Sequence, residues 1–96
     1  MRVLPVRFLR DAQLDFQQIA RFLSRNGASD AVVESYFERI IDRAYSIGNS
    51  PEGYPLMTKL GVGVRIVPFE HSARIAYRVT KDAVEIIRVF YGGQDL

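Results

Sequence analysis

The chain has 96 residues, of which 48% are hydrophobic and 25% charged, which is enough for one domain (residues 1–96) with a buried core and too little for two. It contains no cysteine, which excludes a disulfide framework, thiolate metal sites and cysteine nucleophiles. The net charge is +2, from 13 basic and 11 acidic residues, and so small a surplus does not by itself indicate nucleic-acid binding.

The first segment, residues 2–8, reads as a short strand with Val6 and Phe8 on one face. Pro5 cannot donate a ladder hydrogen bond, so we expect this strand to lie at a sheet edge or to begin near Pro5. Charged and apolar residues alternate here, unlike the core of a signal peptide, and no apolar run in the chain is long enough to span a membrane. We therefore expect a cytoplasmic protein without a membrane partner.

Two helices are predicted next, over residues 11–25 and from about Asp30 to Ile47. Each has one apolar stripe at helical spacing, although Leu14 and Phe22 lie outside the stripe of the first helix. Asn26-Gly27 ends the first helix, and the link to the second is short. The two helices are therefore expected to pack as an antiparallel hairpin.

A loop rich in Gly and Pro covers residues 48–63, and three strands follow it. Their predicted bounds are Val64–Phe69, Ala73–Val79 and Val84–Tyr91. Lys81-Asp82 is the expected tip of the last hairpin, and the pairing that this tip sets puts Arg78 opposite Glu85. The predicted fold is α+β in the order β-α-α-β-β-β, with the helical hairpin packed on a small, mostly antiparallel sheet.

The sequence offers few groups for catalysis or metal binding. The single histidine, His71, falls in a turn between strands and has no acidic cluster around it in the sequence. Gly61-Val-Gly63 lacks the Lys and Ser/Thr that end a phosphate-binding loop, and a strand follows it instead of a helix. We therefore predict no metal site, no cofactor and no catalytic residue.

Several short motifs, in their order and spacing, resemble the ParE/RelE toxin superfamily along nearly the whole chain, and ParE most closely. In the first predicted helix they are Ala12, Asp15-Phe16, Ile19 and Phe22. In the loop after the second helix they are Pro51-Glu-Gly-Tyr-Pro55, followed by Gly63-Val64-Arg65 at the start of the next strand. The last two strands carry Tyr77-Arg78-Val79 and Val84-Glu85-Ile86-Ile87-Arg88-Val89. The chain departs from the family at its end, where Tyr91-Gly92-Gly93-Gln94-Asp95 replaces the frequent His-Gly-x-Arg-Asp.

The resemblance implies the toxin of a type II toxin–antitoxin system, of the kind that serves plasmid stabilization. ParE-type toxins inhibit DNA gyrase by binding it, and a cognate ParD-like antitoxin neutralises them in a hetero-oligomer. RelE-type toxins share the fold but are ribosome-dependent mRNA endoribonucleases. An inert member that binds only its antitoxin is a third alternative.

The resemblance to RelE covers only part of that enzyme's basic site. Arg65 and Arg74 match basic sheet positions of the RNase branch. Gln94, in contrast, stands near the position at which that branch has an arginine close to the end of the last strand. Cleavage by a 2′-hydroxyl needs a group that activates the hydroxyl and cations that support the developing charge. We therefore expect a binding protein and not an enzyme, with the endoribonuclease as the alternative.

The predicted partner-binding residues are Arg65, Arg74, Arg78 and Tyr91. Arg65 either contacts a partner's carboxylate or phosphate, or is a solvated strand residue. Arg74 and Arg78 share a face of a regular strand and form a small basic strip there, unless Arg78 pairs with Glu85.

One further arginine, Arg88, alternates with Val84, Ile86 and Phe90 and therefore falls on an otherwise apolar face. A cation on such a face needs a counter-charge, and we expect Arg88 to be an internal anchor with Asp15 of the first helix as its partner.

Overall fold

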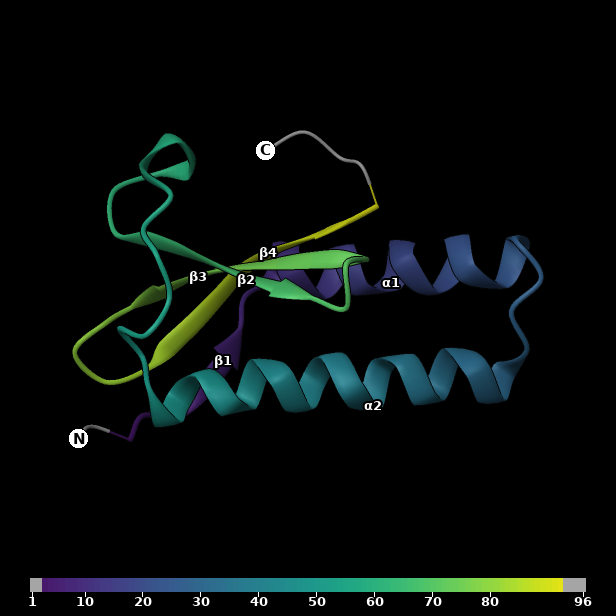
Figure 1. Cartoon of the computed structure of the whole chain (residues 1–96), viewed down its shortest axis with the longest axis horizontal. Helices are drawn as coiled ribbons and strands as arrows, with labels where there is room; N and C mark the ends of the chain where they lie inside the picture. Colours follow the sequence, from purple (N-terminus) through teal and green to yellow (C-terminus); the bar gives the residue numbers. More distant parts are fainter. Residues whose placement is uncertain (1–2, 93–96) are drawn as a thin grey trace.

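The computed structural model describes residues 3–92 of the chain. Its elements, in chain order, are β1 (Val6–Phe8), α1 (Arg10–Arg25), α2 (Asp30–Ser46), the 3-10 turns η1 (Ile47–Asn49) and η2 (Thr58–Leu60), β2 (Val64–Phe69), β3 (Ala73–Val79) and β4 (Val84–Tyr91). The two helices run antiparallel along the length of the molecule, and the strands lie against them (Figure 1). Within residues 3–92, no helix is both long and apolar enough to cross a membrane.

The four strands form one mixed sheet in the order β1-β4-β3-β2. β1 pairs parallel to β4, and the other two pairings are antiparallel. The larger core lies between the sheet and the helices, and a smaller apolar cluster around Val64, Ile66, Ala76 and Phe90 lies on the opposite face of the sheet. The predicted α+β fold, its element order and the pairing of Arg78 with Glu85 across β3 and β4 are confirmed.

β1 begins at Val6 and is shorter than the strand predicted over residues 2–8, whose residue 2 lies outside the described residues. Just before it, the Leu4 amide donates to the carbonyl of Gly48 over 2.9 Å instead of to a strand. A Cβ on Gly48 would come within 2.2 Å of the Leu4 oxygen, so only glycine allows the chain to cross the end of α2 here.

A β-bulge in β4 corrects the predicted alternation along this strand. Ala76 pairs with Arg88 but the next residue, Tyr77, pairs with Ile86, so Ile87 is the extra residue. Ile86 therefore faces the helices while Phe90 belongs to the cluster on the other face. Arg88 does not share one face with both, as regular alternation required.

The expected partnership between Arg88 and Asp15 is confirmed. Nε and Nη2 of Arg88 donate to the two carboxylate oxygens of Asp15 over 2.8 and 3.0 Å. The backbone N–H of Val89 also donates to Asp15, over 2.8 Å. β1 ends at Phe8, so this carboxylate occupies the place of a neighbouring strand along the remaining edge of β4. The contact joins residues 73 and 74 positions apart in the sequence.

We predict that Asp15→Ala lowers the free energy of unfolding by about 2 to 4 kcal/mol, because it leaves the Val89 N–H and the Arg88 guanidinium without their acceptor. Asp15→Asn keeps one acceptor for the amide and should cost less than Asp15→Ala. Arg88→Ala should also cost less, because the Arg88 side chain is 46% exposed and that of Asp15 only 11%. Urea unfolding measures all three.

Asp11→Ala is the matched control, because Asp11 is an exposed acid in the first turn of the same helix. Its loss should cost less than about 1 kcal/mol. Equal costs for Asp15→Ala and Asp11→Ala would contradict the structural role given to Asp15.

Candidate functional site

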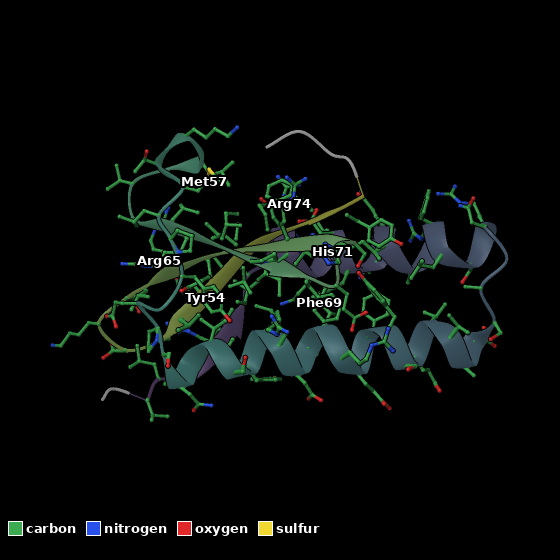
Figure 2. All side chains as sticks on the ribbon, viewed as in Figure 1. Tyr54, Met57, Arg65, Phe69, His71 and Arg74 are labelled. Atoms are coloured by element: carbon green, nitrogen blue, oxygen red, sulfur yellow. The ribbon has the colours of Figure 1, made fainter. Side chains whose placement is uncertain are left out.

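Arg65 lies on the face of the sheet that the helices cover, opposite Tyr77 of β3. Its Nη1 donates to the carbonyl oxygens of Tyr54 and Glu52, over 2.5 and 3.3 Å. Arg65 and Tyr54 lie beside each other where the loop after α2 meets the sheet (Figure 2). The buried hydroxyl of Tyr77 donates to the Pro51 carbonyl over 2.7 Å, so both residues hold the same loop.

Arg74 and Arg78 lie on the other face of the sheet, two residues apart on β3 and therefore separated by about 7 Å along the strand. In Figure 2, Arg74 extends from the sheet away from α2, whereas Phe69 lies between the sheet and α2. The prediction that Arg74 and Arg78 share a face is confirmed. Arg65 does not join them, so the structure does not bring the predicted arginines into one site.

The predicted alternative, an ion pair between Arg78 and Glu85, does not form in the structure. Although the two residues are opposite each other in the ladder, the Glu85 carboxylate lies 3.5 Å from Arg7 of β1. Arg78 instead donates from Nε to the carbonyl of Val62, over 3.4 Å. Arg78 therefore contacts the loop that leads into β2.

Tyr91, the fourth predicted residue, lies on the helix side at the end of β4. Its ring packs against Phe22 of α1 and Tyr36 of α2, with centroid distances of 5.5 and 6.0 Å. This position is far from the loop that Arg65 holds and on the opposite face from Arg74 and Arg78. The four predicted residues thus occupy three separate places.

The turn between β2 and β3 is strained and is tied to α2. Glu70 and His71 have φ angles of +47° and +56°, which cost non-glycine residues about 1 kcal/mol each. Nε and Nη2 of Arg39 donate to the Glu70 carboxylate over 2.8 and 3.1 Å. Next to this pair, the Tyr36 hydroxyl and Ser72 Oγ share a hydrogen bond of 2.9 Å. These contacts from α2 hold the strained turn, and His71 lies in it, between two strands as predicted, with its side chain exposed.

The protonation of the buried groups suits hydrogen bonding better than proton transfer. Burial raises the pKa of the Tyr77 and Tyr36 hydroxyls above the usual tyrosine value, so both remain protonated donors at neutral pH. Hydrogen bonds to Asp15 raise the pKa of Arg88, which stays charged. Within residues 3–92, no three His, Cys, Asp or Glu side chains are grouped closely enough to hold a metal ion.

The sequence-based prediction missed a groove between α1 and the end of β4, with a volume of about 550 Å³. Its side chains include Arg21, Phe22 and Arg25, and Tyr91 is the only predicted site residue that lines it. One signal was present in the sequence, because Phe22 lies outside the apolar stripe of its helix. A single exposed apolar residue is ordinary, and only a contiguous apolar patch marks a contact surface, so Phe22 alone did not reveal the groove.

These features define a small α+β domain in which Arg39, Arg65 and Arg88 hold the fold together, while Arg74 and Arg78 lie on a separate face of the sheet. The model of the family described as the ParE toxin of type II toxin–antitoxin systems, parDE, matches residues 6–96. The chain therefore belongs to the ParE toxin family. No curated protein matches it.

The solved structures that are similar to it include the following two. One is a chain from the chromosomal ParDE toxin–antitoxin system of P. aeruginosa, with a TM-score of 0.79 and 14% sequence identity over 93% of this chain and 96% of that one. The other is the solution structure of a conserved hypothetical protein from Helicobacter pylori, with a TM-score of 0.49 and 18% identity over 96% and 98% of the two chains. At this identity, the first likeness confirms the fold.

Arg65 is predicted to stabilise the loop after α2, so Arg65→Ala should lower the free energy of unfolding by about 1 to 2 kcal/mol. It should also speed amide hydrogen exchange in residues 52–56. Arg78→Ala is the control on the other face, and since Arg78 is exposed and makes one long hydrogen bond, it should cost about 0.5 kcal/mol or less. A larger loss for Arg78→Ala than for Arg65→Ala would contradict these assignments.

The hydrogen bonds from Arg39 lower the pKa of Glu70, and this sets a pH dependence for the turn. A carboxylate whose folded pKa is lowered contributes stability above its unfolded pKa, and that contribution is lost as pH falls through the folded value. The pH range in which the turn loses this contribution therefore lies below the ordinary glutamate pKa of about 4.3. NMR shifts of the residue 70–72 amides should move there in the wild-type chain. They should not move in Glu70→Gln, and identical titrations would refute the link.

Proposed function

We propose that this ParE-family chain is a toxin that inhibits DNA gyrase by binding it, without an enzymatic step of its own. The observation that carries this proposal is the match of the ParE toxin family over residues 6–96. Gyrase works on chromosomal and plasmid DNA, so the proposed place of action is the cytoplasm, and stabilization of a plasmid is one proposed consequence.

The arrangement of the arginines supports a binder over an endoribonuclease. RNA cleavage needs its cations and proton-handling groups around one phosphate. Here the Arg65 guanidinium is held by two loop carbonyls on the helix side of the sheet, and Arg74 is on the other side. Tyr77, which lies opposite Arg65, is buried and its hydroxyl donates to Pro51. Arg65 and Tyr77 serve the fold, and Arg74 does not converge with them on a common substrate position.

We further propose that a ParD-like antitoxin neutralises the chain in a hetero-oligomer. The family description supports this, since it names a toxin of a two-part system. The similar structure from P. aeruginosa supports it as well, because that chain comes from a ParDE toxin–antitoxin system.

Purified full-length chain, added to gyrase with ATP and plasmid DNA, should trap cleaved DNA, measured as linear plasmid after denaturation and protease treatment. Message in translating ribosomes treated with the same amount should stay intact. Arg74→Ala with Arg78→Ala should reduce trapping on the order of tenfold, because the pair supplies the basic strip on the open sheet face.

Arg65→Ala is the matched arginine control, and it should trap gyrase like the wild-type chain at temperatures where it remains folded. Cleaved message with unaffected gyrase would overturn the proposal in favour of the RelE-like endoribonuclease. An effect on neither target would overturn it in favour of an inert antitoxin-binding protein.

A further inference from the structure

The face of the sheet that points away from the helices carries an apolar layer of its own. Three half-buried side chains pack on the small cluster around Val64 and Phe90: Met57, Leu60 and Ile87. Met57 and Leu60 belong to the loop around η2, which lies on the far side of the sheet from α2 (Figure 1), and Figure 2 labels Met57 there. The loop therefore adds apolar side chains to a sheet face that no helix covers within residues 3–92.

The start of this loop is held in place like a short strand. The Met57 N–H donates to the carbonyl of Val64 over 2.7 Å, and the Ile66 N–H donates to that of Pro55 over 3.2 Å. These bonds pair the loop with the outer edge of β2. A partner that binds a segment already ordered in this way loses little affinity to the cost of ordering it.

The tip of the loop presents Val62 to solvent. The Val64 N–H donates to the Gly61 carbonyl over 3.3 Å, and Gly63, in the third position of this turn, has a φ of +77°. This is the arrangement of a type II turn, which demands glycine only at the third position. Val62, in the second position, is 91% exposed, so neither the backbone nor packing requires an apolar side chain there.

Two arginines border the apolar side chains of the loop. Arg78 donates from Nε to the Val62 carbonyl over 3.4 Å, which puts its guanidinium beside the tip. Arg74 lies two residues away on the same face of β3. The acid opposite Arg78 in the ladder, Glu85, is directed to Arg7 instead. An apolar centre with methionine, bordered by arginine, has the composition of a protein interface.

We propose that this surface, made by Met57, Leu60, Val62, Arg74 and Arg78 and called here the η2 surface, is the contact with the target, and that Val62 is its apolar anchor. The inference rests on the proposed function, which already gives the two arginines to gyrase. It adds the chemistry of the site on the target: an apolar pocket that receives Val62, with carboxylates at its rim for the arginines.

The apolar tip distinguishes a protein from a nucleic acid as the occupant of the η2 surface. Contacts to a phosphate backbone come from charged and hydrogen-bonding groups, and a valine side chain supplies neither. An exposed valine continuous with Met57 and Leu60 is instead part of an apolar patch, and such patches mark protein contacts. The charge of Arg74 and Arg78 then selects an acidic border around the pocket.

The test measures binding of purified DNA gyrase to the immobilised full-length chain by biolayer interferometry, beside the trapping of cleaved plasmid. Val62→Asp puts a carboxylate where an apolar pocket should receive the side chain. It should therefore weaken binding by at least about tenfold, and trapping should fall with it. Val62→Ile keeps the apolar anchor and should bind within about twofold of the wild-type chain.

Val32→Asp is the matched control, because Val32 is also an exposed valine, at 56%, but lies on α2. It makes the same change in charge and should bind and trap gyrase like the wild-type chain. Thermal unfolding should show a Tm within about 2 °C of the wild-type value for both Asp variants, since neither valine is buried. If Val62→Asp does not fold, Val62→Ser replaces it, with an expected loss of about threefold or more.

Undiminished binding by the folded Val62 variant, or an equal loss in Val32→Asp, would overturn the inference, and trapping by the wild-type chain would still support the proposed function. Gyrase binding without trapping would refute the proposed inhibition alone, because the loss in Val62→Asp would still locate the contact. A wild-type chain that neither binds nor traps gyrase would overturn both.

Discussion

The structure depends on the carboxylate of Asp15, which accepts a backbone hydrogen bond at the edge of β4 where none of the described strands pairs with it. β1 covers β4 only as far as Ile86, and the backbone beyond it would otherwise present unpaired groups beside a helix. Asp15 accepts the Val89 N–H and binds Arg88 through both oxygens, so α1 has to lie along this edge in one register. The same contact sets where α1 and β4 separate, and thereby where the groove begins.

Most of the fold was predictable because it follows from local patterns. Helical and strand periodicities gave β2, β3 and β4 with their observed bounds, and the short tip at Lys81-Asp82 fixed the pairing of β3 with β4 near the turn. The partnership of Arg88 with Asp15 followed from the need of a cation on an apolar face for a counter-charge. The bulge at Ile87 was not predictable, because Ile-Ile-Arg fits a regular strand equally well, and only packing decides which isoleucine turns outward.

The candidate site was predicted less well, since it depends on how different elements are placed. Within β3, the two-residue period correctly puts Arg74 and Arg78 together, but no local pattern relates this face to that of Arg65 on β2. That relation comes from the register of the hairpin and from the loop that covers Arg65. Arg21 and Arg25 look like an ordinary solvated helix face in the sequence, and become a groove wall only when β4 is in place.

The basic character of the chain therefore has to be read residue by residue. Only Lys59 and Lys81 are lysines, and the preference for arginine has a structural reason, because a guanidinium can bind two acceptors at once. Arg39 spans both oxygens of Glu70, Arg65 two carbonyls, and Arg88 both oxygens of Asp15. These charges hold the chain together and are not available to a nucleic acid. Among the remaining basic residues, Arg21 and Arg25 line the groove at α1, whereas Arg74 and Arg78 lie on the sheet face away from the helices, so these four charges are divided between two separate surfaces.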